Sequence, residues 1–489
     1  MKRHEMKGEG EASWASDEFA EVSLGDKRLD ARLITLCDRF SDAPESPINQ
    51  ACADWAETKA AYRFFQNENV DVGEILAAHR SKTAKRASRH KTVLAIQDTS
   101  YFVYTNHHKT EGLGTLSLKK GKRVEKMGCN GLLMHTCLAV TTQGLPLGLL
   151  DQKIYSRKLY PDKIRRDKSY RPREHLPVAE KESARWLESL AHTKEVMGET
   201  DVVTVCDREA DFYGFFKLSD QIGCPVLVRA KGNRVVNRKY RYSEQEAVRL
   251  WEHIRQQPET GSYTIDIPRR SKTKHAKERE ARSATVTVRF GSFRLNPPRN
   301  YKKHGEEDLP NIDMNAVYVL ENNPPEGEEP VEWMLLSNLP VTSFDEAYEK
   351  VLWYSLRWRI EMYHKVLKSG FRVEACRLGN AERLARYLTI MSIVAWRLFM
   401  ITLVARTDPT TPCSSLLAEQ EWKVLCMKTN RGKPLPRKPP PIGDVVVWVA
   451  KLGGYLARKS DGPPGSITLW RGWKRLADLT EGWNLASES

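Results

Sequence analysis

Residues 202–207 read Val-Val-Thr-Val-Cys-Asp, and this stretch decides how the chain folds. A short, continuous run of apolar and β-branched residues is typical of a strand that is buried on both faces. A second run, Val93–Ile96, leads into Asp98 in the same way. Ligands of open α/β sheets bind at the carboxyl ends of the strands. The sequence therefore predicts an α/β core in which Asp98 and Asp207 lie at one edge of a sheet.

A third acid lies in a segment that has helical spacing. The residues of this segment that recur with that spacing are Tyr354, Arg357, Glu361 and Lys368. At about 100° per residue, one continuous helix would present them within roughly 60° of arc. Three carboxylates form a hard oxygen site suited to Mg²⁺ or Mn²⁺, and neighbouring cations can hold phosphate oxygens. The alternative is an amphipathic helix with a solvated charged stripe.

The composition points to a large basic protein that acts on an anionic partner. The 489 residues predict more than one domain. Lys and Arg outnumber Asp and Glu by 78 to 63, which gives a net charge of +15. This excess favours nucleic acid first and an acidic membrane surface second. The nine cysteines form no Cys-x-x-Cys pair, and no signal peptide is visible. These features argue against zinc and disulfides and for the cytoplasm.

One apolar stretch, residues 387–405, is about long enough to cross a bilayer. Arg397 lies at its middle, where a charge costs roughly 2.5–3.5 kcal/mol on insertion scales. We therefore expect a buried helix of a helical domain and no membrane partner. A membrane-associated protein is the alternative that this stretch leaves open.

The patterning predicts three parts. Residues 1–71 look helical, residues 72–372 form an α/β core, and residues 373–489 are again helical. Within the core, the expected order is three strands, a helix from about 177 to 196, a strand, a helix from about Ala210, and a strand. That order is the one expected of a ribonuclease-H-like fold. Residues of about 232–340 alternate apolar and polar side chains, which predicts an antiparallel β insertion.

Several basic features could contact DNA. Arg28 and Arg32 are one helical turn apart and could form a paired phosphate contact. Arg63 lies among aromatic residues, where ordinary helix core with a snorkelling arginine is the alternative. The basic run 269–277 could be a solvated loop or could touch a phosphate backbone. Residues 430–441 read as a basic, proline-rich linker, and the helices after it suit self-association.

These residues resemble the DDE transposases of the insertion-sequence-four family. The family signature Tyr-x-x-Arg-x-x-x-Glu-x-x-x-x-x-x-Lys is met in full at residues 354–368, and residues 96–99 and 206–211 resemble the two aspartate motifs. The resemblance spans nearly the whole chain. It implies an N-terminal domain that binds transposon ends, a ribonuclease-H-like catalytic core with a β insertion, and a C-terminal domain that holds two subunits together.

The resemblance also implies roles for individual residues. Asp98, Asp207 and Glu361 would be the catalytic ligands of two Mg²⁺ ions, for which Mn²⁺ would substitute. The residues that would contact DNA are Tyr354, Arg357, Lys368, Trp333, Arg28, Arg32 and Arg63. Among these, Trp333 would stack on a flipped base, a role that suits an indole ring, although a buried core tryptophan is the alternative.

The expected function is that of a bacterial cut-and-paste DNA transposase associated with the nucleoid. It would bind double-stranded inverted-repeat ends as a homodimer, cleave both strands through a hairpin intermediate, and join the 3′-OH ends to target DNA. One alternative is a metal-dependent DNA nuclease of the same fold without strand transfer. A non-catalytic DNA-binding relative is another, although all three acids are present.

Overall fold

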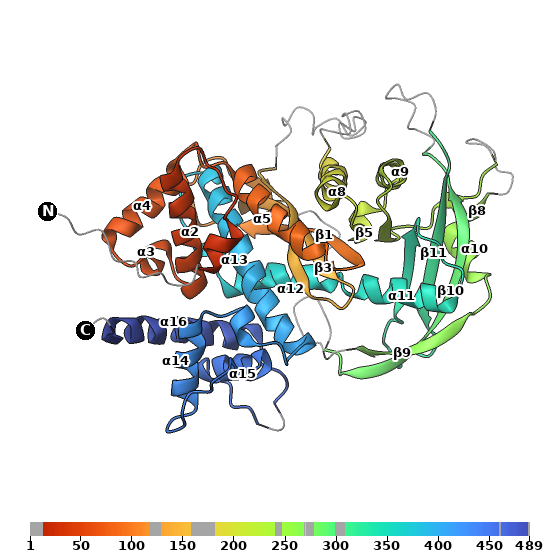
Figure 1. Ribbon diagram of the computed structural model, residues 1–489. Coiled ribbons are helices and arrows are strands. Elements are labelled where there is room, and N and C mark those ends of the chain that lie inside the picture. The colour runs from red at the N-terminus through yellow and green to blue at the C-terminus, as the bar shows by residue number, and fades with distance from the viewer. Residues whose placement is uncertain are drawn as a thin grey trace. The chain divides into compact units, whose positions relative to one another are not determined.

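The computed structural model describes residues 13–116, 129–157, 181–239, 247–267, 269, 278–298, 309–458 and 461–487. The chain divides into two compact units (Figure 1). The first unit comprises Met1–His90, Thr99–Tyr160 and Arg359–Ser489. The second unit comprises Lys91–Asp98 and Pro161–Trp358.

The first unit begins with helices whose start points are set by side-chain caps. Ser13, Asp26, Asp54 and Asp71 each accept a hydrogen bond from a backbone N–H of the first turn that they precede. Such caps satisfy amides that have no partner inside the helix. The capped helices are α1 (Trp14–Glu18), α2 (Lys27–Asp42), α4 (Trp55–Gln66) and α5 (Val72–Ala87), whereas α3 (Ile48–Ala51) follows Pro47 without a side-chain cap. The helical N-terminal region is thereby confirmed.

A long apolar helix, α13 (Ala381–Thr407), forms the centre of the first unit. It contacts α2, α4, α5 and strand β4 (Pro146–Tyr155). It is the one helix of the described residues that is long and apolar enough to cross a membrane, but 78% of its apolar window is buried inside the protein. The prediction of a buried helix fits this packing.

The hairpin of the first unit is formed by β3 (Cys129–Thr141) and β4. The short strand β2 (Gly114–Leu116) pairs with β3 on its other side, and β3 neighbours β1 (Thr92–Val103) in the sheet. β3 and β4 are two of the strands that the sequence predicts before the helix at about 177–196. However, β1 does not end at Asp98, because the residues from Thr99 to Val103 continue it.

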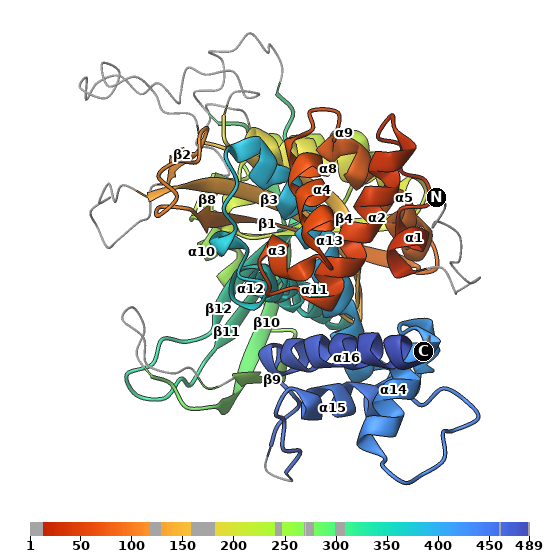
Figure 2. The same cartoon turned by 90° about the vertical axis from the view of Figure 1, so that its left-hand side faces the viewer.

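The C-terminal part of the first unit is helical, as predicted. Its elements are α12 (Trp358–Lys365), η4 (Val366–Gly370), η5 (Val373–Ala375), η6 (Cys413–Ser415), α14 (Glu419–Thr429), α15 (Ile442–Leu452) and α16 (Ser466–Ser487). Figure 2 shows α16 lying along α14 and α15. The approach is so close that a Cβ atom on Gly472 would lie 1.9 Å from the carbonyl oxygen of Val449.

The second unit contains a mixed sheet in the order β1-β5-β6-β12-β11-β10-β9. Parallel pairing joins β1, β5 and β6, and antiparallel pairing joins the remaining strands. The strands that follow β1 are β5 (Asp201–Cys206), β6 (Val226–Arg229), β9 (Gly261–Ile267), β10 (Arg282–Leu295), β11 (Ile312–Glu321) and β12 (Glu332–Ser337). The antiparallel insertion therefore extends the sheet of the core.

Helices cover this sheet. They are α8 (Ala184–Met197), η2 (Arg208–Ala210), α9 (Tyr213–Ile222), α10 (Leu250–Arg255) and α11 (Phe344–Ser355). A separate two-stranded sheet pairs β7 (Val235–Val236) with β8 (Val248–Arg249). Figure 1 shows α8 and α9 on one side of β5 and α11 on the other. With helical regions before and after a central mixed sheet, the predicted α/β, ribonuclease-H-like fold class is confirmed.

Three local predictions need correction. The helix expected from residue 177 begins at Ala184, and residues 177–180 lie outside the described part of the chain. The helix expected from Ala210 starts at Tyr213, after the short η2 turn. The segment 354–368 is not one helix, because α11 ends at Ser355, a turn at Leu356 and Arg357 follows, and η4 has π-helical geometry.

Candidate active site

Two carboxylates are side by side in the second unit. Gln97 of β1 pairs with Cys206 of β5 in parallel register, so the next residues, Asp98 and Asp207, are neighbours. Both residues are half-buried. The two apolar runs predicted both acids at strand ends, and the structure places Asp207 after the end of β5 but Asp98 within β1. Their proximity follows from the common direction of the parallel strands.

The electrostatic environment of Asp207 suits a cation. Burial raises the pKa of Asp207 above its usual value, and the nearby charges of Asp98 and Glu209 raise it further. The backbone N–H of Glu209, which donates to the Asp207 Oδ1 at 2.8 Å, and the guanidinium of Arg357 oppose this rise. A divalent cation would relieve the repulsion between two carboxylates that are held together in this way.

An aromatic pair lies beside these carboxylates in the second unit. Tyr354, near the end of α11, is 6% exposed, and its ring meets the half-buried Trp333 ring edge-on at 5.8 Å between centroids. Burial raises the pKa of Tyr354, while Arg357 and Arg229 lower it and Asp207 raises it slightly. The phenol is therefore neutral at pH 7 and keeps a hydroxyl proton to donate.

Three arginines surround the phenol and the carboxylates. Burial lowers the pKa of Arg229, and the positive charges of Arg208 and Arg357 lower it further, whereas Tyr354 raises it through its charge and a hydrogen bond. The Arg357 guanidinium carbon lies 6.0 Å from the centroid of the Tyr354 ring. Arg229 and Arg357 are half-buried, whereas Arg208 is exposed. Cations beside two acids can hold a phosphodiester whose reacting atoms lie near the acids.

Sequence reasoning assigned no role to Arg229 or Arg208. Arg229 is the last residue of β6, the next parallel strand after β5, so its position at a strand end was a usable signal. Arg208 directly follows Asp207 in the η2 turn. Its proximity to Arg229 depends on the pairing of β5 with β6, which the linear sequence does not display.

The other two signature residues belong to the first unit. Glu361 is half-buried on α12, and Lys368 lies in the π-helical η4, with its ammonium 5.2 Å from the centroid of the Phe102 ring. Helix α12 is fixed by Tyr363, whose hydroxyl donates to the Ser392 carbonyl at 3.1 Å. π-helical turns occur frequently at functional sites.

The boundary between the units falls between Trp358 and Arg359, inside the signature. Among the described residues, no group of three or more His, Cys, Asp or Glu side chains is already arranged to hold a metal ion. The structure therefore brings Asp98, Asp207, Tyr354, Arg357 and Trp333 together in one unit. That Glu361 and Lys368 belong to the same site stays a prediction.

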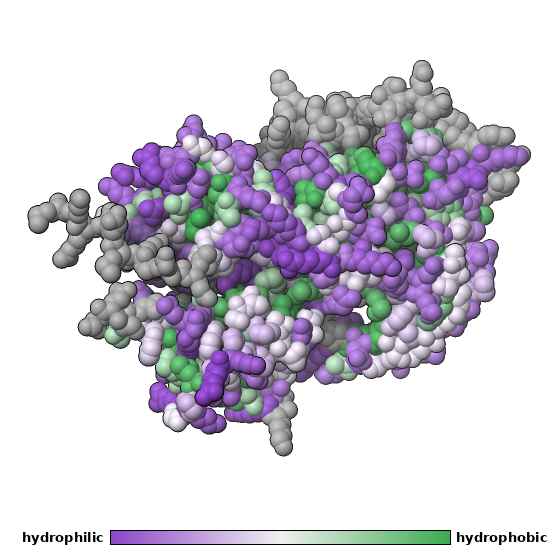
Figure 3. Space-filling view, in the orientation of Figure 1, coloured by the Kyte–Doolittle hydropathy of each residue, from purple (hydrophilic) through white to green (hydrophobic). Residues whose placement is uncertain are grey.

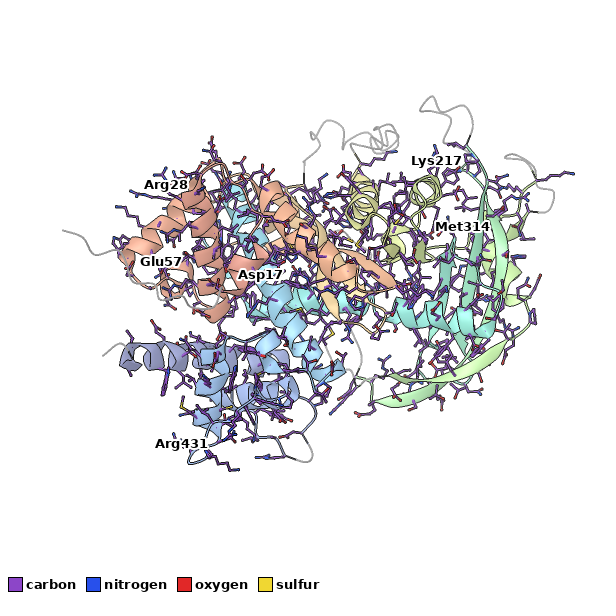
Figure 4. The ribbon with its side chains drawn as sticks, in the orientation of Figure 1. Asp17, Arg28, Glu57, Lys217, Met314 and Arg431 are labelled. Atoms are coloured by element: carbon purple, nitrogen blue, oxygen red, sulfur yellow. The ribbon has the colours of Figure 1, made fainter. Side chains whose placement is uncertain are left out.

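The basic candidates of the N-terminal region lie on its surface. The Arg28 side chain is 90% exposed and pairs with Asp26 at 2.7 Å (Figure 4). Arg32, one turn further along α2, is half-buried, and Arg63 on α4 is exposed while the adjacent Phe64 is buried. The surface over these helices is mainly hydrophilic (Figure 3). Of the basic run 269–277, only Arg269 is described, and it pairs with Glu278 at 2.8 Å.

Three family models match parts of the chain. The Transposase DNA-binding model matches residues 11–70, the Transposase DDE domain model matches 177–397, and the Transposase Tn5 dimerisation domain model matches 393–489. The DDE match contains Asp207 and the whole 354–368 signature, whereas Asp98 precedes it.

The order of these matches and the mixed α/β core define a class, and the chain belongs to the DDE transposases. Within that class it is Tn5-like, because its C-terminal part matches the Tn5 dimerisation domain. It is accordingly an enzyme of DNA cleavage and strand transfer that binds DNA and forms a homodimer. Enzymes with this catalytic domain use a divalent metal, typically Mg²⁺.

Proposed function

We propose that the protein is a cut-and-paste transposase that excises a DNA element at its inverted-repeat ends and joins it to target DNA. The observation that carries this proposal is the pair Asp98 and Asp207 on adjacent parallel strands, with Tyr354, Arg357 and Trp333 in the same unit. The domain assignment that we propose is end binding by residues 1–71, catalysis by residues 72–372 and dimerisation by residues 373–489.

The donor set fits two Mg²⁺ ions, with Mn²⁺ as a substitute. Asp98, Asp207 and Glu361 offer only carboxylate oxygens, which are the ligands that these hard cations prefer. When bound, such a pair of ions would activate the attacking oxygen and stabilise the departing 3′ oxygen. The three acids would hold the ions, and Arg357 and Lys368 would grip the DNA strand near the cleaved end.

The reaction sequence consists of displacements at phosphorus. Water attacks the phosphodiester at the transposon end, the bond to the 3′ oxygen breaks, and a 3′-OH is released. That 3′-OH attacks a phosphodiester of the opposite strand and displaces the 3′ oxygen of the flanking DNA, which closes a hairpin. A second water attacks the hairpin phosphorus and displaces the 3′ oxygen of the element, which releases the 3′-OH again. This 3′-OH then attacks a target phosphodiester and displaces a 3′ oxygen of the target strand. Because every step is an in-line displacement, one set of side chains can serve all of them.

Trp333 has a specific task in this sequence. A hairpin at a DNA end forces a base out of the stack, and an exposed base is stabilised by stacking on an aromatic ring. Trp333 is half-buried, and its ring packs edge-on against the Tyr354 ring. We propose that it receives the displaced base, that cleavage occurs in trans within the homodimer, and that the enzyme works in the bacterial cytoplasm at nucleoid DNA.

A reconstituted reaction tests this proposal. The purified protein is incubated with Mg²⁺, a linear fragment that bears both ends of the element, and a supercoiled plasmid. We expect an excised fragment, a hairpin species that migrates as a double-length strand in a denaturing gel, and plasmids that contain the insert. Cleavage without hairpins or insertion would instead identify a DNA nuclease of the same fold.

A further inference from the structure

The loop between α14 and α15 is a concentrated positive surface that the proposed catalytic steps do not use. From Trp422 to Gly443 the sequence contains no acidic residue. Its cations are Lys423, Lys428, Arg431, Lys433, Arg437 and Lys438. All residues from 431 to 438 are exposed, and Figure 4 shows Arg431, just after the end of α14, at the periphery of the protein. We call residues 430–441 the basic proline loop.

The loop cations are available to a partner. Lys423, on α14, pairs with Glu419 of the same helix. Within the part of the chain that the structure describes, Arg431, Lys433, Arg437 and Lys438 form no ion pair with a carboxylate. Four adjacent cations without internal counter-charges repel one another, and a polyanion would remove that repulsion.

Both ends of the loop are fixed to the protein. At its start, the Asn430 N–H donates to the Cys426 carbonyl at 2.8 Å, which closes the last turn of α14. At its end, the Cys413 N–H donates to the Pro440 carbonyl at 2.9 Å, and Pro441 bridges to Pro412. Backbone contacts therefore fix the positions of both ends of the loop.

The proline content limits the conformations of the loop between these ends. The prolines are Pro434, Pro436, Pro439, Pro440 and Pro441. Each fixes its own φ and lacks an N–H, so the segment cannot pair as a strand. A segment whose conformations are restricted before binding loses less entropy when it is bound. The cations are thus held out on a stiff segment.

We propose that the basic proline loop binds the phosphate backbone of duplex DNA without sequence selection. Residues 431–441 contain no amide and no carboxylate side chain, so their polar side chains are all Arg or Lys, which pair with phosphate oxygens. Phosphate contacts position a protein on DNA without carrying sequence information. The loop lies within the dimerisation match, outside the match for DNA binding at residues 11–70. The inference rests on the proposed function, in which the enzyme must also hold DNA other than its ends.

Salt-dependent binding tests the inference. The full chain is titrated against a fluorescent, random-sequence 40-base-pair duplex in EDTA over a series of NaCl concentrations, and log Kd is plotted against log salt. In the variant Arg431→Gln, Lys433→Gln, Arg437→Gln, Lys438→Gln, we expect the slope to fall by about 0.9 for each lost phosphate contact, up to about 3.6. At low salt we expect the affinity for the duplex to fall at least tenfold.

Two controls test whether a loss of slope is specific to the loop or reflects only the lower net charge of the protein. The variant Arg431→Lys, Arg437→Lys keeps the charges and should retain the parent slope. The variant Lys85→Gln, Arg89→Gln, Lys194→Gln, Lys217→Gln removes the same net charge from other surfaces and should leave most of the slope in place. An equal loss of slope in this second control would overturn the inference.

The remaining outcomes distinguish the inference from the proposed function. If the parent protein binds no duplex, the proposed function fails. If the parent binds and the loop variant shows the same slope, the loop does not contact DNA. If the loop variant loses binding only to vesicles that contain anionic lipid, the occupant is a membrane surface and the inference is wrong. Circular dichroism of each variant verifies that the exposed substitutions leave the fold intact.

Discussion

Replacing Glu18 by Gln should destabilise the first unit, because Glu18 joins α1 to the core through a buried ionic network. Its side chain is 5% exposed and accepts hydrogen bonds from Arg86 Nη1 at 2.7 Å and Nη2 at 2.9 Å. His79 Nδ1 lies 2.6 Å from the Glu18 carboxylate, and His79 Nε2 accepts the Leu149 N–H at 2.9 Å. Because a backbone N–H can only donate, His79 is neutral, with its proton on Nδ1.

The size of the expected loss in folding free energy follows from the pKa of Glu18. Burial opposes ionisation, but the interactions with His79 and Arg86 outweigh it and lower the pKa from 4.5 to about 2. A shift of this size corresponds to about 3 kcal/mol of folding free energy. Because the folded pKa is depressed, this contribution is complete above pH 4.5 and is lost as the pH falls toward 2. Burial also lowers the pKa of His79. Acidification below pH 6.5 therefore favours the unfolded state, in which this histidine is protonated more readily, and lowers the stability further.

Urea denaturation followed by tryptophan fluorescence measures the effect. We expect the difference in unfolding free energy between the parent and Glu18→Gln to be about 3 kcal/mol at pH 7 and less than half of that at pH 3. Asp17→Asn is the matched control, since Asp17 is in the same helix but pairs with Lys82 at the surface, and it should change stability far less (Figure 4). A difference that does not vary with pH would refute the reasoning.

Three further outcomes are expected. Trp333→Ala should retain first-strand nicking but lose hairpin formation at least tenfold, with Trp333→Phe intermediate, when products are resolved on denaturing gels; equal hairpin yields would exclude stacking on this ring. Arg28→Gln with Arg32→Gln should lower the slope of log Kd against log salt by about 1.8 for a duplex that carries the transposon end, as measured by fluorescence anisotropy. An unchanged slope would show that neither residue contacts this DNA. The purified chain should remain in the supernatant after ultracentrifugation without detergent, because α13 is mostly buried; sedimentation with lipid would support a membrane role.

The positions of the two aspartates could be predicted because parallel strands place their ends together. The run before Asp207 is short, apolar and β-branched, and β5 ends at Cys206 as the pattern indicates. The run before Asp98 gave the wrong strand end. Residues Thr99–Val103 include further β-branched and aromatic side chains, which continue the strand past the acid.

The shape of the signature segment could not be predicted from helical periodicity. No proline or glycine marks the turn at Leu356 and Arg357, so no local signal separates α11 from α12. The π-helical η4 packs against a residue far along the chain, since a Cβ atom on Gly370 would lie 2.3 Å from the Trp470 ring. Packing between elements distant in sequence sets this geometry, and one sequence does not display it.

The arginines around Tyr354 illustrate the same limit. Arg357 was found through its spacing, whereas Arg229 and Arg208 join it because β6 pairs with both β5 and β12. Strand order is a property of the folded sheet. Hence the sequence allowed the two aspartates and Arg357 to be predicted, but not Arg229 and Arg208.

The central claim is that Asp98, Asp207 and Glu361 bind shared metal ions, and metal-directed protein cleavage tests it most directly. Fe²⁺ replaces Mg²⁺ in the enzyme bound to an end duplex, and ascorbate with peroxide generates hydroxyl radicals at the metal. We expect backbone cuts near residues 98, 207 and 361 together, all suppressed by excess Mg²⁺ and by Asp207→Asn. Cuts near residues 98 and 207 without any near residue 361 would contradict it.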